Sequence, residues 1–345
     1  MTDIADLSNK GISIVLGSYN RRKFLPLTIT TIRKELEQSD VPYEIIVVDG
    51  GSMDGSIQWL IEQKDIITII QHNRGEWRGK AIKRRSWGYF INLGFKSAKG
   101  KFICMLSDDC LVIPGAIRNG YQLFQKKLLS GENVGAIAFY WRDWPIMDKY
   151  SVHTFYGLIN VNHGIFLREA LEKVNFADEE TYNFYYGDVD LTFKLYEEGY
   201  SVIPCEDSFV EHYLHANLSN RATNNLTQLA DQKSFIQKWK EKILQVPGLN
   251  WNAGEKKRWL SYDDSTRTAN FYSPFNRKFK LSQYAKKIWN YFIQKIGNER
   301  FQKFQYEALK RYVNQSDNNF IKSLQFYHFS LSLNEDTNYT GTDEV

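Results

Sequence analysis

Two adjacent carboxylates, Asp108 and Asp109, follow a run of apolar residues and are the first candidates for chemistry in this sequence. Neighbouring carboxylates repel each other unless a cation or hydrogen-bond donors offset their charge. Oxygen ligands of this kind suit Mg²⁺ or Mn²⁺, which take one or two carboxylates and complete their shell with substrate phosphates. A metal held here would neutralise the charge that develops on a diphosphate leaving group. Alternatively, the pair caps the helix that follows it, and for the pair alone both interpretations stay open.

Two further loops contain groups that suit a nucleotide. Asp49 follows an apolar run, and its carboxylate can accept from a base imide or a ribose hydroxyl. The glycines after it, at 50 and 51, let the backbone approach a ligand closely. Residues 18–21, Ser-Tyr-Asn-Arg, offer backbone donors, a ring for stacking and a cation. Taken alone, the first segment fits a tight turn and the second an ordinary loop.

A second acidic cluster, Asp188 and Asp190, opens a segment of helical character. Asp188 could act as the general base that removes a proton from an acceptor hydroxyl. Carboxylates at a helix start are also what capping and the helix dipole favour, so a structural role stays open. His212 ends a short strand-like run, and its imidazole could be a further metal ligand, although a single histidine is more often structural.

The apolar runs that precede these candidates alternate with segments of helical periodicity. We expect buried strands at residues 12–16, 43–48, 66–70, 101–106 and 134–139, and helices at 24–36, 54–63, 80–98 and 115–129. Continuous apolar strands separated by helices indicate an α/β fold with a doubly wound, mostly parallel sheet covered on both faces. Ligands of such sheets bind beyond the carboxyl ends of the strands. The candidate residues stand at those positions.

The second half of the sequence is less regular. Residues 140–165 look irregular or strand-rich, a helix is expected within 182–199, and short strands at 200–204 and 208–212. Beyond about residue 222 the pattern is helical to about residue 330. We therefore predict a catalytic domain over residues 1–221 and a helical, basic C-terminal region over 222–345.

Residues 271–330 of that region contain 11 Lys and Arg against 3 acidic residues, with aromatic residues interleaved. A basic, aromatic helical segment can lie on an anionic membrane surface, which would bring the protein to a lipid-linked acceptor. The alternative is a helical subdomain packed on the catalytic domain with its cations solvated. Binding of nucleic acid is a weaker option, because no RNA- or DNA-binding motif accompanies the charge.

The amino-acid composition excludes several classes of protein. With 345 residues, 43% of them hydrophobic and 15% aromatic, the chain can bury a sizeable core, and global disorder is excluded. The formal net charge of +4 does not indicate a nucleic-acid binder, and three cysteines are too few for a disulfide framework. The sequence shows no apolar leader and no apolar run of the length that spans a bilayer. These features predict a soluble, cytoplasmic protein, peripheral at the inner face of the membrane if the basic segment binds there.

The order of the motifs is more specific than any one of them. The series Ser18-Tyr-Asn-Arg21, Val48-Asp-Gly-Gly-Ser-Met-Asp-Gly-Ser56, Asn73-x-Gly75 and the DXD-like Ser107-Asp-Asp109 resembles the family 2 glycosyltransferases, which have a GT-A fold. Gly187-Asp-Val-Asp-Leu191 and Val210-x-His212 fall where that family has its acidic base motif and a histidine. The resemblance covers roughly residues 10 to 215.

This resemblance implies metal-dependent, inverting transfer of a sugar from a nucleotide diphosphate sugar to a saccharide or lipid-linked acceptor, in cell-envelope polysaccharide biosynthesis. The metal, Mn²⁺ or Mg²⁺, would be held by Asp109 and His212, and Asp188 would be the catalytic base. The implied nucleotide-sugar binding residues are Ser18, Tyr19, Arg21, Asp49, Gly51, Ser52 and Asp108. Two positions depart from the family: Gly50 stands where a second Asp is common, and Gly187 where a Glu is common.

Other classes of protein fit less well. A Rossmann oxidoreductase or methyltransferase needs a glycine-rich turn after the first strand, and residues 17–23 are not of the form G-x-G-x-x-G. A nucleotidyltransferase would usually have a loop rich in glycine and basic residues there. A non-catalytic sugar-nucleotide or glycan-binding module on the same fold is the remaining alternative, and intact carboxylates at 109 and 188 count against it.

Overall fold

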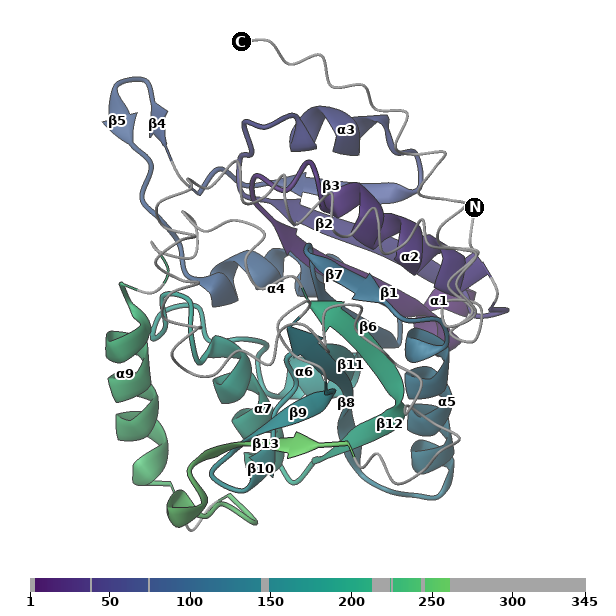
Figure 1. Ribbon diagram of the computed structural model, residues 1–345, viewed down its shortest axis with the longest axis vertical. Helices are drawn as coiled ribbons and strands as arrows, with labels where there is room; N and C mark the ends of the chain where they lie inside the picture. Colours follow the sequence, from purple (N-terminus) through teal and green to yellow (C-terminus); the bar gives the residue numbers. More distant parts are fainter. Residues whose placement is uncertain are drawn as a thin grey trace, which may run out of the picture.

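A single mixed sheet forms the centre of the computed structural model, which describes residues 4–37, 39–73, 75–143, 149–212, 224, 226–242 and 246–260. Its 11 strands run in the order β10-β9-β8-β11-β6-β1-β2-β3, with β12 beside β8, β7 beside β12 and β13 beside β9 (Figure 1).

One half of the sheet is parallel and consists of the four strands that have the most continuous apolar sequences. They are β1 (Ile12–Ser18), β2 (Tyr43–Asp49), β3 (Ile66–Ile70) and β6 (Phe102–Ser107). β1 pairs in parallel with both β2 and β6, and β2 with β3. The strands predicted at 12–16, 43–48, 66–70 and 101–106 are therefore confirmed.

The other half is mixed, because an antiparallel strand is inserted between two strands that share one direction. β11 (Gly164–Leu167) runs antiparallel to β6 on one side and to β8 (Val134–Asp143) on the other. β12 (Ser201–His212) is parallel to β8, and its far end pairs with β7 (Cys110–Val112). The two short strands expected at 200–204 and 208–212 are one strand with an irregularity between Cys205 and Phe209.

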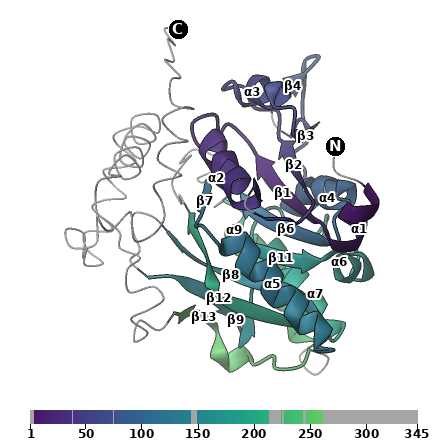
Figure 2. The ribbon, with the colours of Figure 1, turned by 90° about the vertical axis from the view of Figure 1, so that its right-hand side faces the viewer.

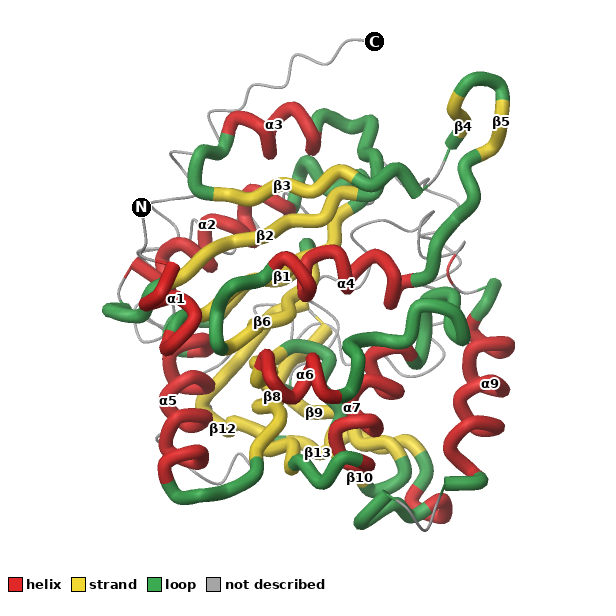
Figure 3. The backbone as a smooth tube through the Cα atoms, turned by 180° about the vertical axis from the view of Figure 1, so that it is seen from behind, coloured by secondary structure: helices red, strands yellow, loops and turns green. Residues whose placement is uncertain are grey.

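Helices cover both faces of the sheet. α2 (Leu25–Glu37) and α5 (Ala116–Leu129) contact each other on one face, and α3 (Ser56–Glu62) contacts β3. α4 (Trp87–Ser97), α6 (Arg168–Lys173) and α7 (Gly187–Glu197) lie on the opposite face, which is seen from behind in Figure 3. In Figure 2, α2 and α4 stand on opposite sides of β1 and β2. This arrangement confirms the predicted α/β class with a mostly parallel, doubly covered sheet.

The long helix predicted at 80–98 was wrong for the residues before Trp87. Glu76–Trp77 (β4) and Lys80–Ala81 (β5) form a small hairpin, visible at the upper left of Figure 1. Its two turn residues, Arg78 and Gly79, have φ of 51° and 73°, as a two-residue hairpin loop requires. The helix starts only at Trp87, where the side chain of Ser86 caps it by accepting from the backbone N–H of Tyr89.

The described part of the C-terminal region contains a strand as well as helix. α9 (Gln228–Lys240) packs through Phe235 and Trp239 on an aromatic cluster that includes Phe193 of α7. After a short 3-10 turn (Trp251–Ala253), β13 (Glu255–Trp259) pairs with the edge strand β9 (Ser151–Phe155). The expectation of helix alone was wrong here, because β13 is a largely exposed, basic edge strand without an apolar pattern.

Three short elements complete the fold: α1 (Ile4–Lys10), β7 beside β12, and β10 (Leu158–Ile159) beside β9. No helix within the described ranges has the length and apolar character that crossing a bilayer requires. The basic segment 271–330, on which the predicted membrane contact rests, lies outside the described residues. The division into domains at residues 221 and 222 stays a prediction.

Candidate active site

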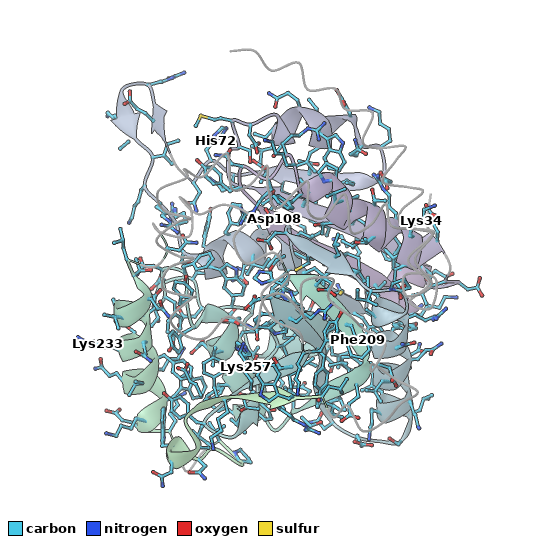
Figure 4. All side chains as sticks on the ribbon, in the orientation of Figure 1. Lys34, His72, Asp108, Phe209, Lys233 and Lys257 are labelled. Atoms are coloured by element: carbon cyan, nitrogen blue, oxygen red, sulfur yellow. The ribbon has the colours of Figure 1, made fainter. Side chains whose placement is uncertain are left out.

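A cavity of about 600 Å³ opens at the carboxyl ends of β1, β6, β8 and β12. The starts of α4 and α7 form its other wall. Strands of one direction bring the residues that follow them to one edge of the sheet, where ligands of such folds bind. Figure 4 labels Asp108 near the centre of this region, between His72 and Lys257 in that view.

Arg21 neutralises the adjacent carboxylates. Its Nε lies 3.2 Å from Oδ1 of Asp108 and its Nη2 lies 3.2 Å from Oδ2 of Asp109. Asp108 and Asp109 are 7% and 6% exposed, so their repulsion is little screened by solvent. Burial, together with the charge of Asp109, raises the pKa of Asp108 to about 6, while Arg21 opposes that rise. Arg21 therefore supplies part of the positive charge that the two carboxylates require.

Asp109 and His212 face each other across the strand ends. Nε2 of His212 lies 3.5 Å from Oδ1 of Asp109, and Nδ1 lies 3.0 Å from Oδ1 of Asp143. Oδ1 of Asp109 is buried and accepts no hydrogen bond from any described residue. Histidines that bind metals commonly donate a hydrogen bond from one ring nitrogen to a carboxylate and bind the metal through the other nitrogen. His212 has a carboxylate near each of its ring nitrogens. The donor set thus fits a divalent cation.

A buried ion pair fixes the strands that carry these residues. Arg142 and Glu211 are directly paired between β8 and β12, and both are about 1% exposed. Nε of Arg142 lies 2.9 Å from Oε2 of Glu211, and the hydroxyl of Tyr150 donates to Oε1 of Glu211 at 2.6 Å. The next pair in the same register is His212 and Asp143. The ion pair therefore sets the register that brings the histidine to its carboxylate.

The loop after β2 is shaped by Asp49. Its Oδ1 accepts from the backbone N–H groups of Gly51 and Ser52 at 2.8 and 2.7 Å, and its Oδ2 accepts from the hydroxyl of Ser52 at 2.7 Å. Burial raises the pKa of this carboxyl, and the bonds from Ser52 and Gly51 oppose the rise. A second cavity, of about 250 Å³, lies on this loop and is lined in part by Tyr19, Gly51, Ser52 and His72. Gly51 has φ +86°, and a Cβ there would lie 2.4 Å from Nδ1 of His72.

The two departures from the family pattern have structural reasons. A Cβ on Gly50 would lie 3.1 Å from Cδ2 of Tyr19, whose ring packs over the glycine. A Cβ on Gly187 would lie 2.8 Å from Cε3 of Trp87, at the start of α4. In each case a ring that lines the cavity lies where a side chain would begin, so a larger residue would require that ring to shift.

Asp188 and Asp190 have different environments although they share the first turn of α7. Asp188 lines the cavity, where its Oδ2 accepts from the side-chain amides of Asn160 and Asn162 at 3.0 and 2.9 Å. Burial raises its pKa, and the bond from Asn160 opposes the rise. Asp190 is fully buried and accepts from Trp239 of α9 at 2.7 Å. The first carboxylate is thus available to a ligand and the second is structural.

A residue of the C-terminal region holds the loop before Asp188. Oδ1 of Asp231 accepts from the backbone N–H of Asn183 at 2.8 Å, and Oδ2 accepts from those of Phe184 and Tyr185 at 3.0 Å each. These three loop residues line the cavity. Asp231 is 1% exposed, and nothing in its sequence surroundings distinguishes it from the polar residues of an amphipathic helix.

Most of the site residues predicted from the sequence lie together in the large cavity. The cavity brings together Ser18, Tyr19, Arg21, Asp108, Asp109, Asp188 and His212. Asp49, Gly51 and Ser52 lie in the adjoining loop, with Gly51 and Ser52 at the second cavity. Sequence reasoning missed other residues of the cavity wall, which include Arg84, Trp141, Asp143, His153, Asn162 and His163. Most of these lie in the segment 140–165, which gave no periodic signal.

Residues 13–166 match the family described as Glycosyl transferase family 2. A chondroitin synthase of Pasteurella multocida (strain Pm70) is 27% identical over 110 residues, which are 31% of this chain and 10% of that protein. Glycosyltransferase GlyG of Streptococcus pneumoniae serotype 4 is 31% identical over 120 residues, 34% of this chain and 36% of that protein. The structure of S. aureus TarS is 14% identical, with a TM-score of 0.49 over 70% of this chain and 41% of TarS. The matched part is thus at most about a third of either curated relative.

Proposed function

Because residues 13–166 match glycosyl transferase family 2, we propose that the chain transfers a sugar from a nucleotide diphosphate sugar to a hydroxyl of a saccharide or lipid-linked acceptor. The proposed reaction is a metal-dependent single displacement that inverts the anomeric carbon. The observation that carries the proposal is one cavity lined by both the Asp109–His212 pair and Asp188. Such a displacement needs charge stabilisation on the leaving side and a base on the attacking side.

Oδ1 of Asp109 and Nε2 of His212 would hold the metal, and Asp143 would orient the imidazole through its other nitrogen. When bound, Mg²⁺ or Mn²⁺ supplies positive charge for the diphosphate leaving group. The described residues contain no cluster of three or more His, Cys, Asp or Glu side chains arranged around one metal position. Donor phosphate oxygens and water would therefore complete the shell, as is usual for Mg²⁺.

Asp188 would accept the proton of the attacking hydroxyl. Asn160 and Asn162 hold its carboxylate in one orientation, which lowers the entropy that must be lost on reaching the reactive geometry. Its raised pKa brings the basicity of the carboxylate closer to neutral pH, where a general base is most effective.

The donor would lie along the ends of β1, β2 and β6. Arg21 keeps Asp108 and Asp109 fixed, and Asp108 would contact the ribose or the sugar. Ser18, Tyr19 and the turn of Gly51 and Ser52 shaped by Asp49 would contact the nucleoside at the junction of the two cavities. Arg84, which also lines the large cavity, would add positive charge near a diphosphate.

For the acceptor, the name of the chondroitin synthase relative supports a saccharide, and a role in polysaccharide biosynthesis follows from it. A lipid-linked acceptor, a cytoplasmic location and contact of residues 271–330 with the inner face of a membrane remain predictions.

The test is thermal unfolding with a panel of nucleoside diphosphates and nucleotide sugars, with and without Mn²⁺ or Mg²⁺. A ligand of the folded state raises the melting temperature by mass action, by an amount equivalent to about 2.7 kcal/mol at a concentration of 100 Kd. We expect a metal-dependent rise with one nucleotide, absent in Asp109→Ala and retained in the control Asp207→Ala, an exposed residue of β12. Release of the nucleoside diphosphate on adding acceptor would then measure transfer.

Two other results would contradict the proposal. A rise with a nicotinamide cofactor or a methyl donor, and with no nucleoside diphosphate, would replace the proposal by the Rossmann-type alternative. Metal-dependent nucleotide binding without transfer to any saccharide would favour the non-catalytic binding module.

A further inference from the structure

Three polar atoms on one wall of the large cavity have no hydrogen-bond partner among the described residues. They are Nε1 of Trp141, Nε2 of His153 and Oδ1 of Asn162. Trp141 lies near the end of β8, His153 in β9, and Asn162 just before β11. Buried polar atoms are nearly always paired with protein or water, so three in one place require a physical reason.

Burial alone does not make such an atom part of a site. Nε1 of Trp251 is also buried without a partner among the described residues, but Trp251 packs on the aromatic cluster around α9 and does not line the cavity. The atoms of Trp141, His153 and Asn162 combine two properties, since each is unpaired and belongs to a side chain that lines the same cavity as Asp188.

Their chemistry favours a neutral ligand with several hydroxyl groups. The indole N–H is a donor, the amide oxygen is an acceptor, and a neutral imidazole nitrogen can be either. Burial and the nearby charge of Lys257 lower the pKa of His153 to about 4, so the imidazole is uncharged at neutral pH. The rings of Trp141 and His153 lie 4.7 Å apart at 45°, which gives an apolar surface beside the polar atoms. Hydroxyl groups on an apolar ring skeleton match both features.

The position of these residues indicates which sugar they would bind. The amide of Asn162 donates to Asp188 at 2.9 Å, so its free oxygen lies one amide group away from the proposed base. The ring of Trp141 meets that of His212 edge-on, with centroids 5.5 Å apart. Asn162 therefore lies beside the proposed base, and Trp141, which contacts His153, lies beside the metal-facing histidine, so the wall that carries the three atoms reaches the place where an acceptor hydroxyl would meet the donor.

We propose that Trp141, His153 and Asn162 form a subsite that binds hydroxyl groups of the acceptor sugar. This inference rests on the proposed function, because the acceptor side is defined by Asp188. It assigns the binding of the acceptor to residues of β8, β9 and the loop before β11, outside every motif that the sequence displays.

The test uses the indole N–H signals of the full chain labelled with ¹⁵N-tryptophan. Nine tryptophans give nine signals, and Trp141→Phe identifies the one of Trp141 by its loss. Methyl glycosides of a neutral, an acidic and an N-acetylated hexose are titrated into protein saturated with Mg²⁺ and the nucleoside diphosphate that binds. We expect at least one glycoside to shift the Trp141 signal until the shift saturates. The signal of Trp259, which is 48% exposed and does not line the cavity, should not move.

Two variants probe the polar atoms while keeping an aromatic ring. Trp141→Phe and His153→Phe should each weaken glycoside binding roughly three- to tenfold, as expected for one lost neutral hydrogen bond. Trp259→Phe, the matched control, should not change it. Binding of the nucleoside diphosphate, measured separately, reports whether a variant keeps its fold, and His153→Phe serves if Trp141→Phe does not fold.

Each other outcome overturns the inference in a recognisable way. If nucleotide binds but no glycoside shifts the Trp141 signal, the subsite is refuted while the proposed function survives. If the nucleotide sugar shifts that signal and the nucleoside diphosphate alone does not, the atoms bind the donor sugar instead. If no nucleotide binds at all, it is the proposed function that fails.

Discussion

Nδ1 of His212 lies 3.0 Å from Oδ1 of Asp143, its direct neighbour on the adjacent parallel strand. When Nδ1–H donates to this carboxylate, Nε2 of the neutral imidazole faces Oδ1 of Asp109, 3.5 Å away, and could bind a metal. The tautomer that could bind a metal would therefore be selected by a residue on β8, while the nitrogen proposed to face the metal belongs to β12.

The first prediction concerns this selection. Asp143→Ala should weaken the binding of Mn²⁺ about 10- to 100-fold, the usual effect of removing the partner of a ligating histidine. Isothermal titration of Mn²⁺ into protein with bound nucleoside diphosphate measures the change, and Asp207→Ala on β12 is the control. Equal Mn²⁺ affinity in Asp143→Ala and wild type would show that Asp143 does not orient a metal ligand.

The second prediction separates the two carboxylates of α7. Asp188→Asn should reduce kcat about 10²- to 10⁴-fold, the range for loss of a general base, with the melting temperature nearly unchanged. Asp190→Asn should instead lower the free energy of unfolding by about 1–3 kcal/mol, because it weakens buried bonds to Trp239 and Lys238. Its kcat per folded molecule should stay close to wild type. The reverse assignment of effects would mean that Asp190 is the base.

The third prediction is an acid limb in the activity. Both carboxyls proposed to act in the reaction have raised pKa values, Asp108 to about 6 and Asp188 above its ordinary range, each chiefly through burial. As the pH falls, protonated Asp188 can no longer accept a proton, and protonated Asp108 loses the charge that pairs with Arg21. We expect kcat/KM to decline with falling pH before the ordinary carboxyl range of about pH 4 is reached. A profile that is flat down to about pH 4, with fold and donor binding intact at each pH, would exclude Asp188 as the base.

The sequence located the residues at the ends of β1, β2 and β6 better than those of β8, β9 and the loop before β11, and the reason is structural. β1, β2 and β6 are buried on both faces, so each is a continuous apolar run whose end can be located, and polar loops follow directly. Asp143 was missed because β8 continues to residue 143, four residues beyond the predicted end, through pairing with β12. Asn162 and His153 lie on short antiparallel strands or loops that have no period of their own. β13 is defined by backbone pairing with β9, which side-chain patterns do not reveal.

The last prediction concerns Asp231, which connects the C-terminal region to the site. Asp231→Asn replaces one acceptor oxygen by an amide donor, which must then face a backbone N–H of residues 183–185. An unpaired buried donor costs about 1–3 kcal/mol, so this loop should open more often while the sheet keeps its stability. Hydrogen exchange followed by mass spectrometry should show faster exchange at 183–185, with unchanged protection in β1 and β6. Because the loop lines the cavity beside Asp188, where the acceptor is proposed to bind, KM for the acceptor should rise while the Kd of the nucleoside diphosphate stays constant.

Phe235→Leu is the matched control, since Phe235 is buried on the same helix and makes no contact with the loop backbone through hydrogen bonds. This change removes part of a buried ring and leaves a small cavity, so it lowers the free energy of unfolding through lost packing alone. If Phe235→Leu accelerates exchange at 183–185 and raises the acceptor KM as much as Asp231→Asn, then the packing of α9 as a whole positions the loop. If only Asp231→Asn does so, the carboxylate itself holds the segment that leads into Asp188, and the residues beyond 222 take part in building the site.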